Sequence, residues 1–260
     1  MRNIKKYDEL TKYINVFSKK DLNLLIVLSR GGLGKSTIME NELLKHNPLM
    51  FKGHVTPLSL YKQLYDRSEE ENDFLLVLDD VDSLLNNKTN ITLLKQICET
   101  KENKTVYYSS STPLLGDRDQ YFETSCKVII LLNDIETFAS DISLNALLSR
   151  AHILNFNPPS GEILEYMSEY AKDTKILEFI EKYAKASNNL NLRTYEKAEE
   201  LKKAKLNWKD EITEGLQISK RLIEIDILLN RYDNDIERLK HFKGSRMTYY
   251  KAKKKYLKNK

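Results

Sequence analysis

The sequence has few of the features that mark secreted, metal-binding or membrane-spanning proteins. It contains two cysteines, Cys98 and Cys126, and four histidines, and none of them has the spacing of a metal-binding motif. Its longest clean apolar runs have five residues, whereas a membrane helix needs about 20, and its N-terminus is charged rather than apolar. We therefore expect a reduced chain in a bacterial or host cytoplasm, with no membrane contact.

The net charge is small but unevenly distributed. It is +4 for the 260 residues, yet residues 239–260 carry nine Lys or Arg and no acid, which leaves −5 for the preceding 238 residues. A slightly acidic body with a basic tail is typical of a nucleic-acid-binding appendage. A solvated lysine-rich tail is the alternative. The length suits one full core with one or two small appendages.

Short apolar segments alternate with amphipathic ones as far as residue 156, which predicts an α/β fold with a parallel sheet covered on both faces. The expected strands are Leu24–Leu28, Leu49–Lys52, Phe74–Leu78, Val128–Leu132 and His152–Phe156. The expected helices between them span 35–46, 57–66, 89–99 and 141–149. Thr56 and Pro57 are typical of a helix start. Residues 105–126 fit neither pattern and are interpreted as an inserted hairpin.

After Pro158 and Pro159 the sequence predicts only helices. They are expected at 160–172, 174–185, 191–205, 208–230, 233–242 and 246–258. Ser160 and Ser245 are expected to cap the first and the last of them through their hydroxyls. The expected domains are an α/β core over 1–157, a helical part over 158–206 and a small all-α C-terminal domain over 207–260.

A glycine-rich loop directly follows the first apolar strand. The sequence Ser29-Arg-Gly-Gly-Leu-Gly-Lys-Ser-Thr37 lies between a strand and a helix, as a phosphate-binding P-loop (Walker A motif) requires. Small residues let backbone N–H groups reach phosphate oxygens, and the next helix adds its positive N-terminal end. The residues expected to bind ATP are Arg30, Gly31, Gly32, Leu33, Gly34, Lys35, Ser36 and Thr37. Ser29 stands where the motif usually has its first glycine.

Two side chains of this loop and two later acids have expected roles. Lys35 is expected to reach the β- and γ-phosphates, and Ser36 to hold Mg²⁺ through its hydroxyl. Asp79 and Asp80 end the apolar run Phe74–Leu78, as in a Walker B motif, where ligands bind in parallel sheets. We expect Asp79 to orient the Mg²⁺ and its water, and Asp80 to act as the general base on the attacking water.

On these motifs, residues 20–205 resemble the AAA+ ATPase family, which implies an AAA+ parallel-sheet P-loop core and a helical lid. The segment 128–133 is similar to the sensor 1 strand of that family, whose last polar residue positions the hydrolytic water; here that residue is Asn133. The serine cluster 109–111 is the alternative. The segment 188–194 is similar to the sensor 2 pattern, so Arg193 is expected to open a lid helix and reach back to the nucleotide.

The resemblance also implies assembly. The segment ending in Leu148-Ser149-Arg150 is similar to that of clamp-loader ATPases, in which the arginine enters the ATP site of the neighbouring subunit. Arg150 in that role requires a homo-oligomer, and hexamers are usual in the family. The inserted hairpin is similar to one that some AAA+ clades use to touch DNA, with Tyr107, Tyr108 and Arg118 as candidates.

The C-terminal residues 222–258 have the layout of a helix-turn-helix: a short amphipathic helix, a tight turn at Lys243 and Gly244, and a basic second helix. Periodicity predicts that Met247, Tyr250 and Leu257, with the stem of Lys254, pack inward, and that Arg246, Tyr249, Lys253 and Tyr256 face outward. The residues expected to contact DNA are Arg246, Tyr249, Lys253 and Lys254.

The resulting hypothesis is a Mg²⁺-dependent AAA+ ATPase coupled to DNA, in DNA replication or helicase loading, with a replication protein as a further partner. One alternative is an ATP switch in a regulatory DNA-binding protein, because Asp80 stands where AAA+ proteins commonly carry Glu and leaves slow hydrolysis open. Another is a module whose basic tail binds an acidic protein.

Overall fold

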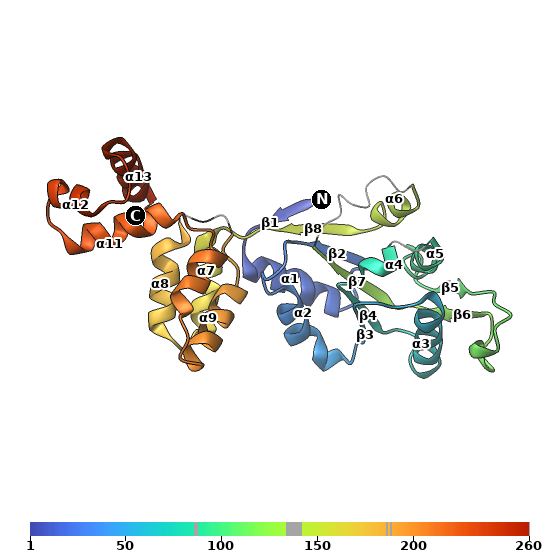
Figure 1. The fold of residues 1–260 in the computed structure, drawn as a ribbon. Coiled ribbons are helices and arrows are strands. Elements are labelled where there is room, and N and C mark those ends of the chain that lie inside the picture. Colours follow the sequence, from blue (N-terminus) through green and yellow to red (C-terminus); the bar gives the residue numbers. More distant parts are fainter. Residues whose placement is uncertain (86–87, 134–141, 186, 188, 260) are drawn as a thin grey trace. The chain divides into compact units, whose positions relative to one another are not determined.

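The computed structural model describes residues 1–85, 88–133, 142–185, 187 and 189–259. The chain divides into two compact units, Met1–Pro158 and Pro159–Lys260 (Figure 1). The boundary lies at the proline pair. Whether the second unit separates further into the expected lid and C-terminal domain stays a prediction. No helix among the described residues is long and apolar enough to cross a membrane.

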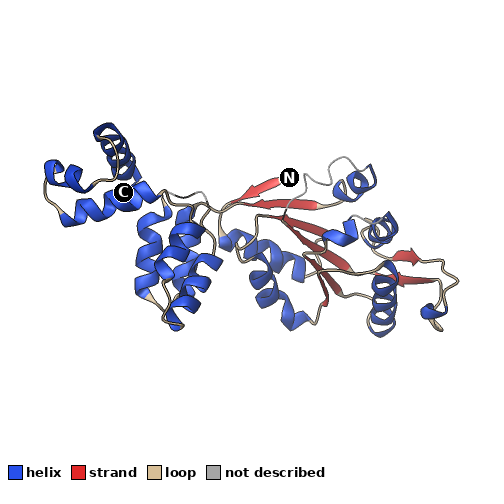
Figure 2. Cartoon of the chain, in the orientation of Figure 1, coloured by secondary structure: helices blue, strands red, loops and turns tan. Residues whose placement is uncertain are grey.

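The first unit is built on a six-stranded sheet in which every neighbouring pair of strands is parallel (Figure 2). The strand order is β1-β8-β2-β7-β4-β3. The bounds are β1 Arg2–Ile4, β2 Leu24–Leu28, β3 Leu49–Lys52, β4 Leu75–Asp79, β7 Lys127–Leu132 and β8 His152–Phe156. The α/β parallel sheet and its five expected strands are confirmed, and the edge strand β1 is an addition.

The central strands are apolar throughout because both of their faces are covered. Every residue of β2 and of β4 is buried, and in β7 only the first residue, Lys127, is partly exposed. Neighbouring strands align side by side, with Leu24 opposite Val128 and Ile26 opposite Ile130. This continuous burial is what a parallel sheet between helical layers requires.

The helices of the first unit lie along this sheet (Figure 1). They are α1 Tyr7–Ser18, α2 Lys35–Leu43, α3 Pro57–Glu70, α4 Asp82–Leu85, α5 Lys88–Ile97 and α6 Ile142–Leu148, with 3-10 turns at Leu44–His46 and Pro113–Leu115. Thr56 caps α3, because its hydroxyl accepts from Ser59 N at 3.2 Å and Pro57 takes the first helical position. That expected helix start is confirmed. Helix α1, not foreseen, buries Leu10, Ile14 and Phe17.

The expected hairpin over 105–126 is formed by the short strands β5 Lys104–Tyr107 and β6 Tyr121–Thr124, which pair antiparallel in a two-stranded sheet of their own. Strand β6 contacts α3 and β5 contacts α5. Tyr61 of α3 stacks on Tyr108, with ring centroids 5.0 Å apart. The hairpin is therefore held against the core by aromatic packing and does not extend the main sheet.

The described residues of the second unit form helices and no strand. The helices are α7 Ser160–Tyr170, α8 Thr174–Ala184, α9 Arg193–Lys203, α10 Trp208–Gly215, α11 Lys220–Arg231, α12 Asp235–His241 and α13 Arg246–Asn259. Two expectations are wrong here. The single helix expected over 208–230 is two helices, because Gln217 has a left-handed φ of 54° that ends α10. Ser160 makes no side-chain cap, because it is already inside α7 and Pro159 takes the cap position.

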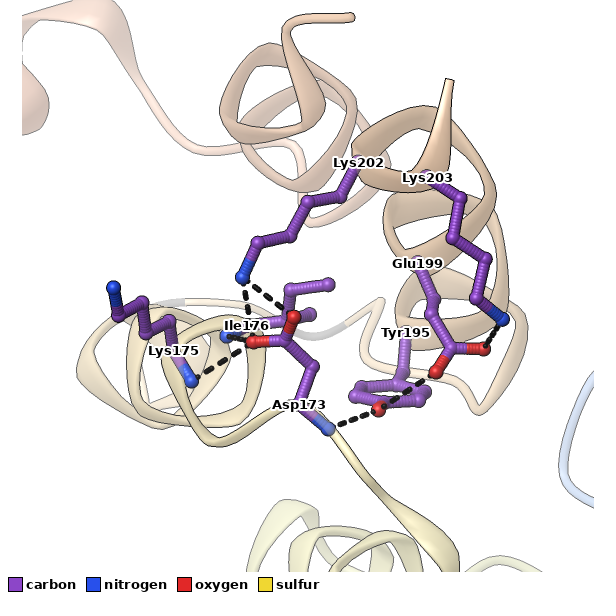
Figure 3. Close-up of polar contacts among 7 residues, drawn as sticks. All are labelled: Asp173, Lys175, Ile176, Tyr195, Glu199, Lys202 and Lys203. Carbon is purple, nitrogen blue, oxygen red and sulfur yellow. Dashed lines mark hydrogen bonds and ion pairs between the residues drawn. The ribbon is translucent and has the colours of Figure 1, made fainter. Parts of the chain in front are cut away.

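Helices α8 and α9 are joined by the carboxylate of Asp173 (Figure 3). Its Oδ1 accepts from the backbone N–H groups of Lys175 and Ile176 at 3.1 and 3.3 Å, which caps α8. Lys202 of α9 donates to both carboxylate oxygens, at 2.7 and 2.5 Å. The backbone N–H of Asp173 donates to the Tyr195 hydroxyl at 2.9 Å. One acid thus fixes the start of α8 and its contact with α9.

Helices α11, α12 and α13 share a small core of Ile225, Leu228, Phe242 and Tyr249. Helix α13 starts at the expected hydroxyl cap, since Ser245 Oγ accepts from Thr248 N at 3.2 Å. With only four fully buried side chains in this core, hydrogen bonds and ion pairs carry much of the packing between these helices.

Candidate functional site

The P-loop connects β2 to α2 in the expected strand–loop–helix order. Gly32 and Gly34 have left-handed φ values of 77° and 81°, which glycine adopts without strain. Gly34 caps α2, so the N-terminus of that helix opens onto the loop. Ser29 is not among the described residues with a left-handed φ, and its backbone N–H donates to Leu132 O at 3.1 Å. Serine is therefore compatible with the position where the motif usually has glycine.

Lys35 connects the loop to the end of the neighbouring strand β7. Its side chain is buried, and Nζ donates to the carbonyl oxygens of Ser29 and Leu132, both at 2.7 Å. It also donates to Asn133 Oδ1 at 3.1 Å. The ammonium group therefore lies over the loop, at the edge of the sheet where β2 and β7 end.

Ser36 and Asp79 face each other at the same edge. The Ser36 hydroxyl donates to Asp79 Oδ1 at 3.1 Å. Asp79 is 5% exposed, and burial raises the pKa of its carboxyl, an effect that the hydrogen bond from Ser36 opposes. Among the described residues, no group of three or more His, Cys, Asp or Glu is arranged so that it could hold a metal ion. Mg²⁺ at a phosphate site needs only one or two carboxylates with the phosphates themselves, so the hydroxyl and carboxylate oxygens here fit Mg²⁺.

Asn133 joins the lysine to the second acid. Its Oδ1 accepts from Lys35, and its Nδ2 donates to Asp80 Oδ1 at 3.1 Å. Asp80 is exposed and has a left-handed φ of 51°, a conformation that Asp tolerates better than most residues and that is frequent at functional sites. The serine cluster 109–111 follows β5, outside the main sheet. This placement favours Asn133 over the serines as the sensor 1 residue.

The remaining residues of the expected nucleotide site differ in exposure. Gly31 and Thr37 are exposed and Arg30 is partly exposed, whereas Leu33 is 1% exposed. Leu33 is thus anchored in the core and offers only its backbone to a ligand. Arg193 is the first residue of α9 and is exposed. It belongs to the second unit, and its contact with the nucleotide stays a prediction.

Arg150 lies between α6 and β8. It is partly exposed, and its Nη1 donates to Ala146 O at 2.9 Å, within its own segment. That bond holds the guanidinium beside the last turn of α6. Its action on the site of a neighbouring subunit stays a prediction.

The order of the sheet explains how distant segments meet at one site. The P-loop strand β2 pairs with β7, and β7 pairs with the acidic strand β4, all parallel. Their carboxyl ends therefore bring the P-loop, Asn133 and the acid pair 79–80 to one edge, where open α/β sheets bind ligands. A helical region follows this core. A P-loop core on a parallel sheet, followed by helices, is the arrangement that the resemblance to AAA+ ATPases implies.

No protein-family model matches the chain, and no curated protein matches it. Among solved structures it is similar to two variants of Thermotoga maritima RuvB, at 14% and 15% identity. These matches cover 90% and 89% of this chain and 78% and 76% of RuvB, with TM-scores of 0.48 and 0.49. It is also similar to a DNA replication initiation factor, at 14% identity over 95% of this chain and 74% of that one, with a TM-score of 0.43.

The expected faces of the C-terminal helix α13 are wrong. Tyr249, expected to contact DNA, is 0% exposed and belongs to the core of α11–α13. Met247, Tyr250 and Leu257, expected inside, are 81%, 42% and 55% exposed. Tyr256, expected outside, is half-buried and packs against the same core.

Two acids explain the orientation of α13. Asp235 accepts from the Tyr249 hydroxyl at 2.7 Å and pairs with Lys253 through both oxygens at 2.6 Å. Asp226 accepts from the Tyr256 hydroxyl at 2.5 Å. These bonds turn the side chains of Tyr249, Lys253 and Tyr256 toward the core of α11–α13. Lys253 is thereby neutralised, whereas Arg246 and Lys254 are exposed. Sequence reasoning did not consider Asp226 and Asp235. A partial signal was present, because both acids shortly precede a basic segment that has no acid of its own.

The hairpin residues proposed for DNA contact are largely engaged in the fold. Arg118 makes a two-bond ion pair with Asp66 of α3, with both distances 2.6 Å. Tyr108 is stacked on Tyr61. Tyr107 is 61% exposed, with its ring 5.8 Å from that of Tyr121. Only Tyr107 of the three presents most of its surface to solvent.

Proposed function

We propose that this chain binds ATP with Mg²⁺ and hydrolyses it to ADP and phosphate, as an AAA+-type ATPase whose cycle is coupled to DNA. The observation that carries the proposal is the continuous contact from Lys35 through Asn133 to Asp80, beside the pair formed by Ser36 and Asp79. Five polar groups from three adjacent strand ends meet where a P-loop presents backbone N–H groups.

Each group has a role that follows from its position. The backbone N–H groups of residues 30–37 bind phosphate oxygens, and Lys35 exchanges its carbonyl partners for the β- and γ-phosphates. Ser36 and Asp79 hold Mg²⁺, which neutralises charge on the phosphates when bound. Asn133 orients a water molecule. Asp80 accepts a proton from that water as its oxygen attacks the γ-phosphorus and ADP leaves.

Assembly and partner belong to the same proposal. Arg150 acts on the γ-phosphate of a neighbouring subunit, which requires a homo-oligomer, and a hexamer is the expected size. The expected contact of Arg193 with the nucleotide is part of the same proposal. The coupled process is replication or helicase loading, together with a replication protein. The exposed basic residues of α13 supply the DNA contact.

An ATP-dependent switch with slow hydrolysis is the second candidate, and one observation favours it. Asp80 is one methylene shorter than the Glu that AAA+ proteins commonly carry, and Asn133 holds its carboxylate at 3.1 Å. A shorter base held by its neighbour reaches less far toward an attacking water. Nucleotide-dependent DNA binding with little turnover would support this candidate over the ATPase.

The test is ATP turnover by the purified full chain, with and without single- and double-stranded DNA. Lys35→Ala is expected to abolish turnover, because Lys35 Nζ lies between the loop and the end of β7, where the phosphates are expected. Lys45→Ala, the same change at an exposed lysine after α2, is the control. Stimulation by DNA supports the coupling. Turnover that survives Lys35→Ala would overturn the site assignment.

A further inference from the structure

A shallow cleft lies between the start of α11 and one side of α13. Its volume is about 160 Å³. It is lined by Ser219, Arg221, Leu222, Thr248, Lys251, Ala252 and Lys255. Three of these side chains are cationic, two carry hydroxyls and none is acidic or aromatic. Thr248, Lys251 and Lys255 are spaced three and four residues apart, so they lie on one face of the helix.

The cations of this cleft are unpaired, in contrast to those that face the core. Within the described residues, no carboxylate forms an ion pair with Arg221, Lys251 or Lys255. Asp235 instead pairs with Arg238 and Lys253. Asp226 and Asp235 are thus occupied on the inner side of α13, whereas the lining of the cleft carries three cations and no acid.

We propose that this cleft, made by Arg221, Thr248, Lys251 and Lys255, binds the phosphate backbone of duplex DNA. The inference rests on the proposed coupling to DNA and assigns the contact to residues other than those expected from the sequence. Exposed Lys254, on the adjoining outer face of α13, extends the same surface. Tyr249 and Lys253 hold α13 in place rather than touching DNA.

The chemistry of the cleft favours backbone contact over base reading. Lys and Arg with hydroxyl neighbours are the groups that meet phosphate oxygens. Arg and Lys can also read guanine, but the cleft is lined by no Asn or Gln to read adenine and by no aromatic side chain on which the bases of a single strand could stack. Residues four positions apart in an α-helix, such as Lys251 and Lys255, are separated by about 6 Å along the helix axis. Two base pairs of duplex DNA span a similar length of about 6.8 Å along the DNA axis. Binding should therefore depend on salt and little on sequence.

The experiment measures DNA affinity of the full chain by fluorescence anisotropy. Two labelled duplexes of unrelated sequence, about 20 base pairs long, are titrated between about 50 and 200 mM salt. The test variant is Lys251→Gln with Lys255→Gln. Its matched control is Lys240→Gln with Lys243→Gln, which removes the same charge from exposed lysines elsewhere in α12 and the following turn. Arg221→Gln tests the opposite wall.

Losing two phosphate contacts should weaken binding at least about tenfold at 0.1 M salt and lower the salt slope by about 2, equally for both duplexes. The control should change affinity by less than about twofold, because exposed charges are screened over about 10 Å. Lys251→Arg with Lys255→Arg should retain binding, since it keeps both cations.

Several outcomes would overturn the inference. An equal loss of DNA affinity in the Lys251/Lys255 variant and the Lys240/Lys243 control would mean that only net charge matters. The proposed coupling to DNA would then stand without this cleft. Equal loss in the Arg pair and the Gln pair would mean a structural effect. A tenfold preference for one duplex would contradict backbone binding, and tighter binding of single-stranded RNA would reassign the ligand. A native chain that binds no duplex would refute both the inference and the coupling.

Discussion

The carboxylate of Asp226 is the most connected acid in the helical unit, and replacing it with Asn gives a sharp test of how α13 is held. Asp226 is 4% exposed. Its Oδ2 accepts from Lys182 and from the Tyr183 hydroxyl, the latter at 2.7 Å. Its Oδ1 accepts from the Tyr256 hydroxyl at 2.5 Å and from Asn230 Nδ2 at 3.0 Å. One acid thus links α8, α11 and α13.

The expected loss follows from these four donors. An amide has one acceptor oxygen, and its nitrogen is a donor. Asp226→Asn therefore turns an N–H group toward two existing donors and removes the charge from the other two bonds. A hydrogen bond to a charged group contributes about 1.5–3 kcal/mol. Because the Lys182 side chain is 39% exposed, its share is screened, and a total near 3 kcal/mol is expected.

The single tryptophan makes this loss measurable in the helical unit alone. Trp208 packs on Phe179 of α8, with ring centroids 5.5 Å apart. Its fluorescence during urea unfolding therefore reports on this unit. With a slope of about 1–3 kcal/mol per M, the midpoint should fall by about 1–3 M. Asp233→Asn, the same change at an exposed acid nearby, should leave the midpoint within a few tenths of a molar of the native value.

The pH dependence separates the charge from the shape of the side chain. Burial raises the pKa of Asp226, but the bonds from Lys182, Tyr256 and Tyr183 outweigh it, so its pKa lies below the ordinary value. A lowered pKa stabilises the folded unit above the unfolded pKa, near 3.9, and this stabilisation is lost as the pH falls through the folded pKa. The native and Asn chains should differ at pH 7 and converge in acid. If the unfolding midpoints of the two chains differed by the same amount in acid as at pH 7, the reasoning would be refuted.

Three further predictions concern the nucleotide site. Asp79→Asn should unfold at a higher urea concentration than the native chain at pH 7, because burial raises the pKa of the Asp79 carboxyl and the stability of the fold is lost as the pH rises through that pKa. Circular dichroism during urea unfolding measures the change. The same variant should lose Mg²⁺-dependent ATP binding. Asn133→Ala should lower turnover by about 10²-fold while a fluorescent ATP analogue binds within severalfold; an equal loss of both would indicate a structural role. Arg150→Ala should bind ATP but not turn it over, and mixing it with Lys35→Ala subunits should restore activity if the arginine acts between subunits.

The core could be predicted because its signals are strong and local. Strands buried on both faces need continuous apolar runs, and β2, β4 and β7 have them. The P-loop then predicts which strand ends meet. Strand β1 has three residues, of which only Ile4 is buried, and so short an edge strand has no periodicity to detect.

The break between α10 and α11 was missed for a different reason. Two buried pairs, Ile212 with Leu216 and Ile218 with Leu222, each have the four-residue spacing of a helix, and this hid the break although the two pairs are out of phase with each other. The chain turns at Gln217, whose backbone has a left-handed φ. Glycine adopts this conformation without strain, but residues with a side chain rarely do, so the identity of Gln217 does not predict it. Tertiary packing decides the conformation there, and Ser219 ahead of α11 was the remaining sequence signal.

The faces of α13 show where periodicity reaches its limit. In a large core, transfer of apolar area outweighs single polar contacts, so hydrophobic spacing sorts a helix correctly. The core of α11–α13 has four buried side chains, and there the buried Asp226 and the partly exposed Asp235 decide which side chains turn inward. Tyr249 and Tyr256 bring both an apolar ring and a hydroxyl donor to Asp235 and Asp226, whereas Met247 brings no donor.

The same reasoning separates the proposed nucleotide site from the acids that hold α13. A P-loop motif indicates which strand ends lie beside it, so the polar residue at the end of the neighbouring strand pointed to Asn133. Asp226 and Asp235 belong to no motif, and their partners come from four helices. Asp235 neutralises Lys253, whereas Arg221, Lys251 and Lys255 of the α11–α13 cleft form no ion pair among the described residues. The DNA contact proposed for this cleft therefore depends on which cations the fold neutralises, and charge alone cannot select them.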